Sequence, residues 1–167
     1  VVIFHRALVA GGDTAAIDAL CSALGARGLN AVGLYVTSLK DDRSIAFLRT
    51  ALAAHRPDII VNATAFATAT ARENAGILSE TDCPVLQVAQ ASISRKNWES
   101  STRGLNPRDL AMHVVLPEVD GRIFANAIAF KEAGQSLGSF TPTAFRPVED
   151  RVKATADLAA AWVRLRR

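Results

Sequence analysis

Short apolar runs and longer amphipathic stretches alternate along this chain, a pattern that predicts alternating strands and helices. Continuous apolar runs bounded by polar residues are typical of strands buried on both faces of a parallel sheet. Such runs lie within residues 1–4, 31–36, 58–62, 85–88 and 113–116. Residues 123–130 are also apolar, and we interpret them as a sixth strand or an extended arm.

Helical spacing of apolar residues predicts the elements between these runs. One helix is expected over about residues 14–27, capped by Asp13 or Thr14, and a second begins at Asp42 or Ser44. Shorter helical segments are expected near 74–80, 95–100 and 107–112, and a last helix from about 148 to the end. Residues 6–13 and 63–72 are expected to be loops.

Strands at this spacing with helices between them predict an α/β fold. We expect a doubly wound, mostly parallel sheet in a flavodoxin-like three-layer sandwich, followed by a C-terminal helix. Residues 1–133 form the predicted α/β domain, and residues 134–147, rich in Gly, Ser, Thr and Pro, form a linker.

The last helix, residues 148–167, carries apolar side chains on two sides. A helix of this kind needs more protein around it than one sheet face supplies. We therefore expect it to stand away from the sheet or to pack on a neighbouring molecule, as a helix that belongs to the next part of a longer protein. The chain is then a piece of that protein.

Composition narrows the function classes. The chain has 167 residues, 50% hydrophobic and 21% charged, which is enough for one domain with a sizeable core. Its net charge of +3 comes from residues 151–167, which carry +4 and leave residues 1–150 at −1. A basic face that reads nucleic acid is therefore not expected.

Targeting signals and metal-binding cysteine spacings are not recognisable in this sequence. No apolar run approaches the roughly 20 residues of a membrane span, and no signal peptide is in view. Cys21 and Cys83 are far apart in the sequence, and we interpret them as free thiols. We expect a cytoplasmic protein that binds no membrane.

Familiar nucleotide and nucleophile motifs are missing. The sequence has no G-x-x-x-x-G-K-[ST], no G-x-G-x-x-G after the first run and no G-x-S-x-G, and its histidines form no H-x-x-x-H pair. We therefore expect the chain neither to bind nor to hydrolyse ATP.

Polar side chains follow the predicted strands at the sheet edge where ligands of doubly wound folds bind. They are His5, Arg6, Asn62, Thr64, Gln87, Gln90 and Glu118. The same side chains can instead satisfy backbone groups or lie in a solvated loop. A free-standing small-molecule-binding domain of flavodoxin-like type is a further interpretation of these side chains, and the two apolar sides of the last helix argue against it.

One stretch is more specific. Residues 103–122, Arg-Gly-Leu-Asn-Pro-Arg-Asp-Leu-Ala-Met-His-Val-Val-Leu-Pro-Glu-Val-Asp-Gly-Arg, resemble the large subunit of ATP-dependent cobaltochelatase, in a family that includes the porphyrin-binding subunit of magnesium chelatase. Both branches share the core at residues 115–121. Residues 104–113 are closer to the cobalt branch, as are residues 37–41, 58–67 and 84–88.

The resemblance implies a metal-inserting ligase. The family's large subunit binds a tetrapyrrole and a divalent metal, whereas separate AAA-type ATPase subunits use ATP and Mg²⁺, which are then not bound here. In the cobalt branch Co²⁺ enters a corrin precursor, hydrogenobyrinic acid a,c-diamide, during aerobic cobalamin biosynthesis. Two alternatives remain: a non-catalytic module that docks the ATPase subunits, or a domain of the magnesium chelatase porphyrin-binding subunit.

Metal insertion requires removing two pyrrole N–H protons and stripping water from the metal. Glu118 and His113 are the catalytic candidates, because a carboxylate or an imidazole can take a proton or ligate the metal. Glu118 and Asp120 are the candidate metal ligands. On a straight strand His113 and Glu118 would lie roughly 16 Å apart. The alternatives are a solvent-facing Glu118, a structural His113 and an Asp120 that only forms a turn.

Overall fold

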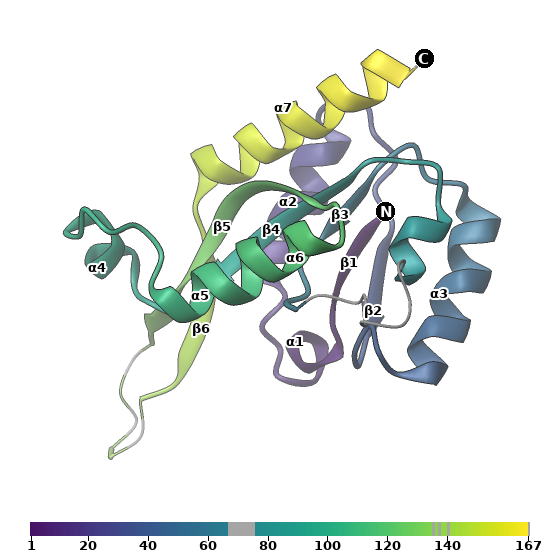
Figure 1. Ribbon diagram of the computed structural model, residues 1–167. Helices are drawn as coiled ribbons and strands as arrows, with labels where there is room; N and C mark the ends of the chain where they lie inside the picture. Colours follow the sequence, from purple (N-terminus) through teal and green to yellow (C-terminus); the bar gives the residue numbers. More distant parts are fainter. Residues whose placement is uncertain (67–75, 135, 137, 140, 167) are drawn as a thin grey trace.

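A six-stranded sheet organises the protein, in the order β2-β1-β3-β4-β5-β6 (Figure 1). The computed structural model describes residues 1–66, 76–134, 136, 138, 139 and 141–166. The strands are β1 (Val2–His5), β2 (Gly33–Val36), β3 (Ile60–Asn62), β4 (Val85–Ala91), β5 (Ile123–Ala133) and β6 (Thr143–Pro147). Strands β1 to β5 run parallel, and β6 is antiparallel to β5.

Helices cover both faces of this sheet, as expected for a doubly wound fold. They are α1 (Arg6–Ala10), α2 (Ala15–Gly25), α3 (Asp42–His55), α4 (Arg95–Glu99), α5 (Pro107–Leu110), α6 (Leu116–Val119) and α7 (Glu149–Arg166), with a 3₁₀ turn η1 (Ile77–Glu80) and a π-helical turn η2 (Ala111–Val115). Leu86 and Val88 of β4 pack with α2 and α7 in one core cluster, whereas Ile3 and Ile60 pack with α3 in a second cluster. The predicted three-layer α/β architecture is confirmed.

The expected strand at residues 113–116 is wrong. Asn106 caps a helix by accepting from the Asp109 N–H at 2.8 Å, and α5, η2 and α6 continue from it as one helical segment over residues 107–119. Pro117 lies inside this segment, where a proline removes one helical hydrogen bond. The π-helical turn just before it changes the bonding, because the Leu116 N–H donates to the Ala111 carbonyl. Strand β5 supplies the fifth parallel strand instead.

Residues 6–10 and 143–147 form regular elements where loops were expected. Helix α1 follows β1 directly, where the sequence predicted a loop. Part of the predicted linker forms β6, because residues 143–147 pair antiparallel with β5. The Asp13 carboxylate, just before α2, also accepts from the Phe145 N–H at 3.0 Å. The loop predicted at 63–72 and the helix predicted at 74–80 fall partly on residues outside the described ranges.

Helix α7 lies against the sheet, so the expectation that it stands away is wrong. Val152, Ala156, Ala159 and Val163 are buried in the same core as α2. An ion pair of 2.8 Å joins Asp157 of α7 to Arg27, just beyond α2. The second apolar stripe is only partly covered: Trp162 packs on the core, but Leu165 is 80% exposed. Within the described residues no helix is long and apolar enough to cross a membrane.

Candidate functional site at the carboxyl edge of the sheet

Three buried polar side chains meet where β3 and β4 run side by side. Asn62 and Gln87 are register partners, and the Asn62 Nδ2 donates to the Gln87 Oε1 at 2.7 Å. The Thr64 hydroxyl donates to the Asn62 Oδ1 at 3.0 Å, and the Gln87 Nε2 donates to the Thr64 carbonyl at 2.8 Å. All three residues are fully buried. They bond to one another and hold the strand ends in place, since buried polar groups need such partners.

Arg122 and Asp120 extend this network toward β5. The Arg122 Nη2 donates to the Asp120 Oδ2 at 2.6 Å, and its Nη1 donates to the Gln87 Oε1 at 3.3 Å. The two side chains are 1% and 2% exposed. Burial lowers the pKa of Arg122, and the carboxylate of Asp120 opposes that effect. The buried Asp120–Arg122 ion pair therefore connects the turn that carries Asp120 to Gln87 of the sheet.

His5 and His113 are two half-buried imidazoles near this network. The His5 Nε2 accepts from the Ala65 N–H at 3.4 Å. Burial lowers the pKa of His5, and a hydrogen bond with the backbone of Thr37 opposes this effect. Burial also lowers the pKa of His113, the nearby His5 adds to this, and Asp109 opposes it. Both imidazoles are therefore held as neutral bases near pH 7.

Asp109 anchors the helical segment to the end of β4. Its Oδ2 accepts from the Ser92 N–H at 2.8 Å, the Ser92 hydroxyl at 3.0 Å and the Asn106 Nδ2 at 2.9 Å. Asp109 lies four residues before His113, which places a buried carboxylate near the imidazole. Neither Asp109 nor Arg122 was predicted from the sequence as a site residue, although both fall within residues 103–122.

The candidate catalytic residues lie on one helical segment. Because residues 113 to 118 are helical, His113 and Glu118 are separated by about 7.5 Å along the axis, and not by the longer distance of a strand. Glu118 is exposed on α6, and the Nδ1 of His113 is buried without a partner among the described residues. Asp120 is bonded to Arg122, two residues away.

The two other predicted site residues, Arg6 and Gln90, lie apart from each other and from the polar network. Arg6 is exposed at the start of α1. Gln90 is buried on the face of β4 opposite to Gln87, because side chains alternate along the strand. It therefore does not join the network. Among the described residues, no group of three or more His, Cys, Asp or Glu side chains gathers as a metal site would require.

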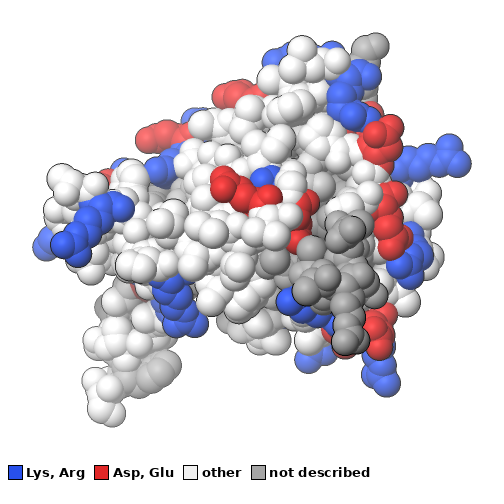
Figure 2. Space-filling model, viewed as in Figure 1, with Lys and Arg blue, Asp and Glu red and all other residues white. Residues whose placement is uncertain are grey.

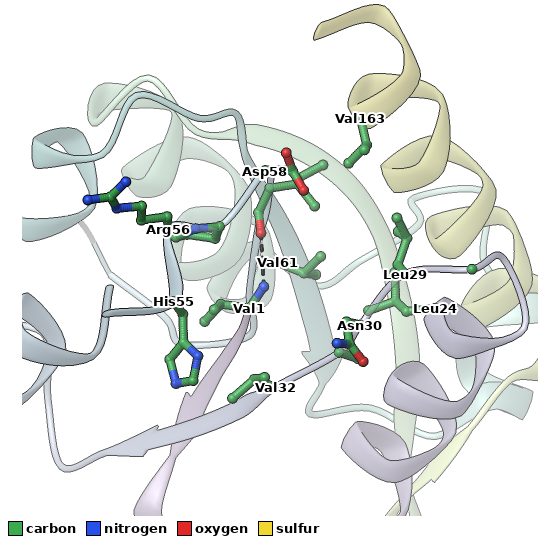
Figure 3. Close-up of a pocket in the computed structure, with 14 residues that line it drawn as sticks. Val1, Leu24, Leu29, Asn30, Val32, His55, Arg56, Asp58, Val61 and Val163 are labelled. Atoms are coloured by element: carbon green, nitrogen blue, oxygen red, sulfur yellow. Dashed lines mark hydrogen bonds between the residues drawn. The ribbon is translucent and has the colours of Figure 1, made fainter. Parts of the chain in front are cut away.

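Two of the cavities formed by the described residues lie at opposite edges of the sheet. A cavity of about 270 Å³ is lined by Val1 and Val32 near the amino ends of the strands, with His55 and Val163 (Figure 3). None of the described residues that line it belongs to the polar network. A second cavity, of about 320 Å³, lies at the carboxyl edge and is lined by His5, Thr37, Ser38, Leu39, Lys40, Ala65 and Phe66.

Comparison with known proteins gives a consistent relationship over the whole chain. The sequence model described as CobN/Magnesium Chelatase matches residues 1–167. The chain belongs to this family. It is 43% identical over 170 residues to a protein named aerobic cobaltochelatase subunit CobN from Sinorhizobium sp., and 36% identical over 168 residues to one of the same name from Pseudomonas aeruginosa. Each comparison covers 99% of this chain.

A solved member of the CobN/magnesium chelatase family has the same fold. The catalytic subunit of cobaltochelatase from Mycobacterium tuberculosis superposes on 99% of this chain with a TM-score of 0.83 and 28% sequence identity. This chain spans only 13–14% of the length of the two curated relatives and 14% of the solved chain.

Proposed function

We propose that this chain is one domain of the large subunit of an ATP-dependent chelatase, which inserts Co²⁺ into a corrin precursor in aerobic cobalamin biosynthesis. The observation that carries the proposal is the 43% identity to an aerobic cobaltochelatase subunit over 99% of the chain. The precursor is hydrogenobyrinic acid a,c-diamide, and Co²⁺ is a substrate.

In this proposal Glu118 faces the incoming metal or a pyrrole proton, and its backbone is held rigidly. The Gly121 N–H donates to the Glu118 carbonyl at 2.9 Å, and the N–H groups of Asp120 and Arg122 donate to the Pro117 carbonyl at 3.0 and 3.2 Å. An exposed carboxylate on a fixed turn can take a proton or a metal ion without rearranging. Asp120 acts through Arg122 to hold the turn, and a direct ligand role requires that ion pair to open.

His113, five residues before Glu118 on the same helical segment, and His5, at the end of β1, supply neutral imidazole bases. Neutral imidazole suits both a proton acceptor and a transient ligand of Co²⁺. Asn62, Thr64 and Gln87 hold the strand ends and position these groups. Arg6 is free to approach carboxylates on the rim of a tetrapyrrole, since it is exposed near the same edge. Gln90 remains a candidate substrate contact only from the opposite face.

Separate AAA-type subunits hydrolyse ATP with Mg²⁺ in this proposal. Their action requires a surface on which they or other parts of the subunit can dock. Leu110, Val115 and Val119 are 45%, 51% and 70% exposed along the segment of residues 107–119. Figure 2 shows mostly uncharged surface over α5 and α6. This apolar surface favours the second candidate function, an interaction module whose chemistry lies elsewhere in the subunit.

Metal insertion by the full-length subunit with its ATPase partners tests the proposal. Co²⁺ and Mg²⁺ are each offered with the corrin precursor and with a porphyrin. Insertion of Co²⁺ into the corrin supports the cobalt branch, whereas insertion of Mg²⁺ into the porphyrin supports the magnesium branch. Replacing Leu110 and Val119 by serine should abolish ATPase docking but keep tetrapyrrole binding if the domain is only an interaction module.

A further inference from the structure

Phe66 combines a strained backbone with an exposed aromatic ring. Its φ is +72°, a conformation that costs free energy for a bulky residue and that glycine adopts without strain. The residue is nevertheless 50% exposed, so burial of the ring offsets little of the cost. Strained residues of this kind persist where their surroundings fix them, and they cluster at ligand sites.

Two hydrogen bonds fix this conformation, one from the helical segment of residues 107–119 and one from Arg122, just before β5. The Phe66 N–H donates to the Met112 carbonyl at 3.0 Å, and the Arg122 Nη1 donates to the Phe66 carbonyl at 3.2 Å. Arg122 is itself held by Asp120 and Gln87. The polar network therefore fixes where the Phe66 backbone lies.

Phe66 lines the cavity of about 320 Å³ at the carboxyl edge of the sheet. The strand order β2-β1-β3 places this cavity at the point where the connections change direction, and ligands of doubly wound folds bind there. His5 ties the walls together, because its Nε2 accepts from the Ala65 N–H while it also bonds to the backbone of Thr37. The walls are therefore held in place without a ligand.

The lining residues define a ligand chemistry. They include the Phe66 ring, the hydroxyl-bearing Thr37 and Ser38, and Lys40, and no Asp or Glu is among the described residues that line the cavity. The nearby Asp41 carboxylate already accepts from the Ser44 N–H and hydroxyl. Helix α1 follows β1 directly, so no glycine-rich loop is present at that point to cradle a phosphate. These features favour a carboxylate attached to a flat apolar body.

We propose that this cavity is a carboxylate subsite, in which the Phe66 ring packs against the edge of the macrocycle and Lys40 pairs with one of its peripheral carboxylates. The inference rests on the proposed tetrapyrrole substrate and adds to it the residues that orient the ring. A free small carboxylate would satisfy the same Lys40 chemistry, and the experiment separates the two sources.

Equilibrium binding to the full-length subunit tests the subsite, with tetrapyrrole fluorescence as the readout. The ligands are the ring with free carboxylates, the same ring with its carboxylates esterified, and succinate. The variants are Phe66→Gly and Lys40→Met, with Phe47→Ala and Lys96→Met as controls at exposed positions outside the cavity. The melting temperature of each variant is measured in parallel.

We expect Phe66→Gly to weaken binding of both rings about tenfold, because the aromatic ring that packs against the macrocycle, here called the platform, is lost. The melting temperature should not fall, because glycine adopts the positive φ at this position without strain. Lys40→Met should weaken the free-acid ring about tenfold and leave the ester unchanged. A lower melting temperature with unchanged affinity for Phe66→Gly would overturn the platform role. An equal effect of Lys40→Met on acid and ester, or no effect, would overturn the carboxylate role.

Failure of the wild-type subunit to bind either ring would instead contradict the proposed function. In that case binding of succinate to wild type and its loss in Lys40→Met would support a small-carboxylate site. Absence of succinate binding would overturn the subsite as well.

Discussion

Asp120 and Arg122 form an ion pair of 2.6 Å that is almost completely shielded from water, between the turn after α6 and the first residue before β5. Through Arg122 the pair reaches both Gln87 of β4 and the backbone of Phe66. One guanidinium thus joins the helical segment, the sheet and the strained residue at the candidate site.

Asp120→Asn should destabilise the chain by about 3–5 kcal/mol, because it removes the carboxylate charge that pairs with the buried Arg122 guanidinium at 2.6 Å. Urea denaturation of the 167-residue chain measures the change. Asp157→Asn removes an equivalent carboxylate from the exposed pair with Arg27 and serves as the matched control. Similar effects at the two positions would contradict a special role for the buried pair.

Helix α7 should contribute to the stability of the same core. Val163→Ala removes two buried methyl groups facing α2 and should cost about 2 kcal/mol, whereas Leu165→Ala at an 80% exposed position should stay within about 0.5 kcal/mol. The free energy of unfolding from urea titration distinguishes them. If Val163→Ala were as mild as Leu165→Ala, α7 would not be integral to this domain.

Acidification below neutral pH should destabilise the fold through His5 and His113. Burial lowers the pKa of both in the folded state, so the unfolded chain binds protons that the folded chain does not. The two histidines contribute fully to the free energy of unfolding at pH values above their unfolded pKa of about 6.5. This contribution is lost as the pH falls from the unfolded pKa toward the lower pKa values of the folded state. The free energy of unfolding should therefore fall between pH 7.5 and 5.5.

The double variant His5→Gln, His113→Gln should flatten this pH dependence, because glutamine keeps polar atoms but does not titrate in that range. Its free energy of unfolding is measured across the same pH interval. A slope equal to that of wild type would assign the pH dependence to other groups.

The sheet was largely predictable from sequence because buried parallel strands are short continuous apolar runs, as at residues 58–62 and 85–88. The apolar run at 113–116 was wrongly predicted as a strand, because a short apolar run does not distinguish a buried strand from a helix. The cap at Asn106 predicted a helix that ends near residue 112, whereas the helical segment continues through Pro117. The π-helical turn at residues 111–115 joins α5 to α6.

The site was predictable only where it depended on strand ends. Asn62 and Gln87 were expected at one edge, and their strand register brings them into contact. Gln90 was misplaced because the side chains of β4 alternate between faces. Arg122 was missed because its role arises from β5 pairing in parallel with β4, which no local pattern around Arg122 encodes.

Glu118→Gln should separate binding from chemistry in the full-length subunit. The substitution keeps size and hydrogen bonding but removes charge and basicity, so tetrapyrrole affinity should persist while the rate of metal insertion falls about 10²–10⁴-fold. Steady-state insertion with ATPase subunits and saturating tetrapyrrole measures the rate. Glu149→Gln, at another exposed position near a helix start, is the control and should retain activity.

A Glu118→Gln rate within about threefold of wild type would fit a surface acid that contributes little free energy. The insertion role would then pass to His113, whose replacement by alanine in the same assay should abolish turnover while leaving the Asp120–Arg122 turn intact.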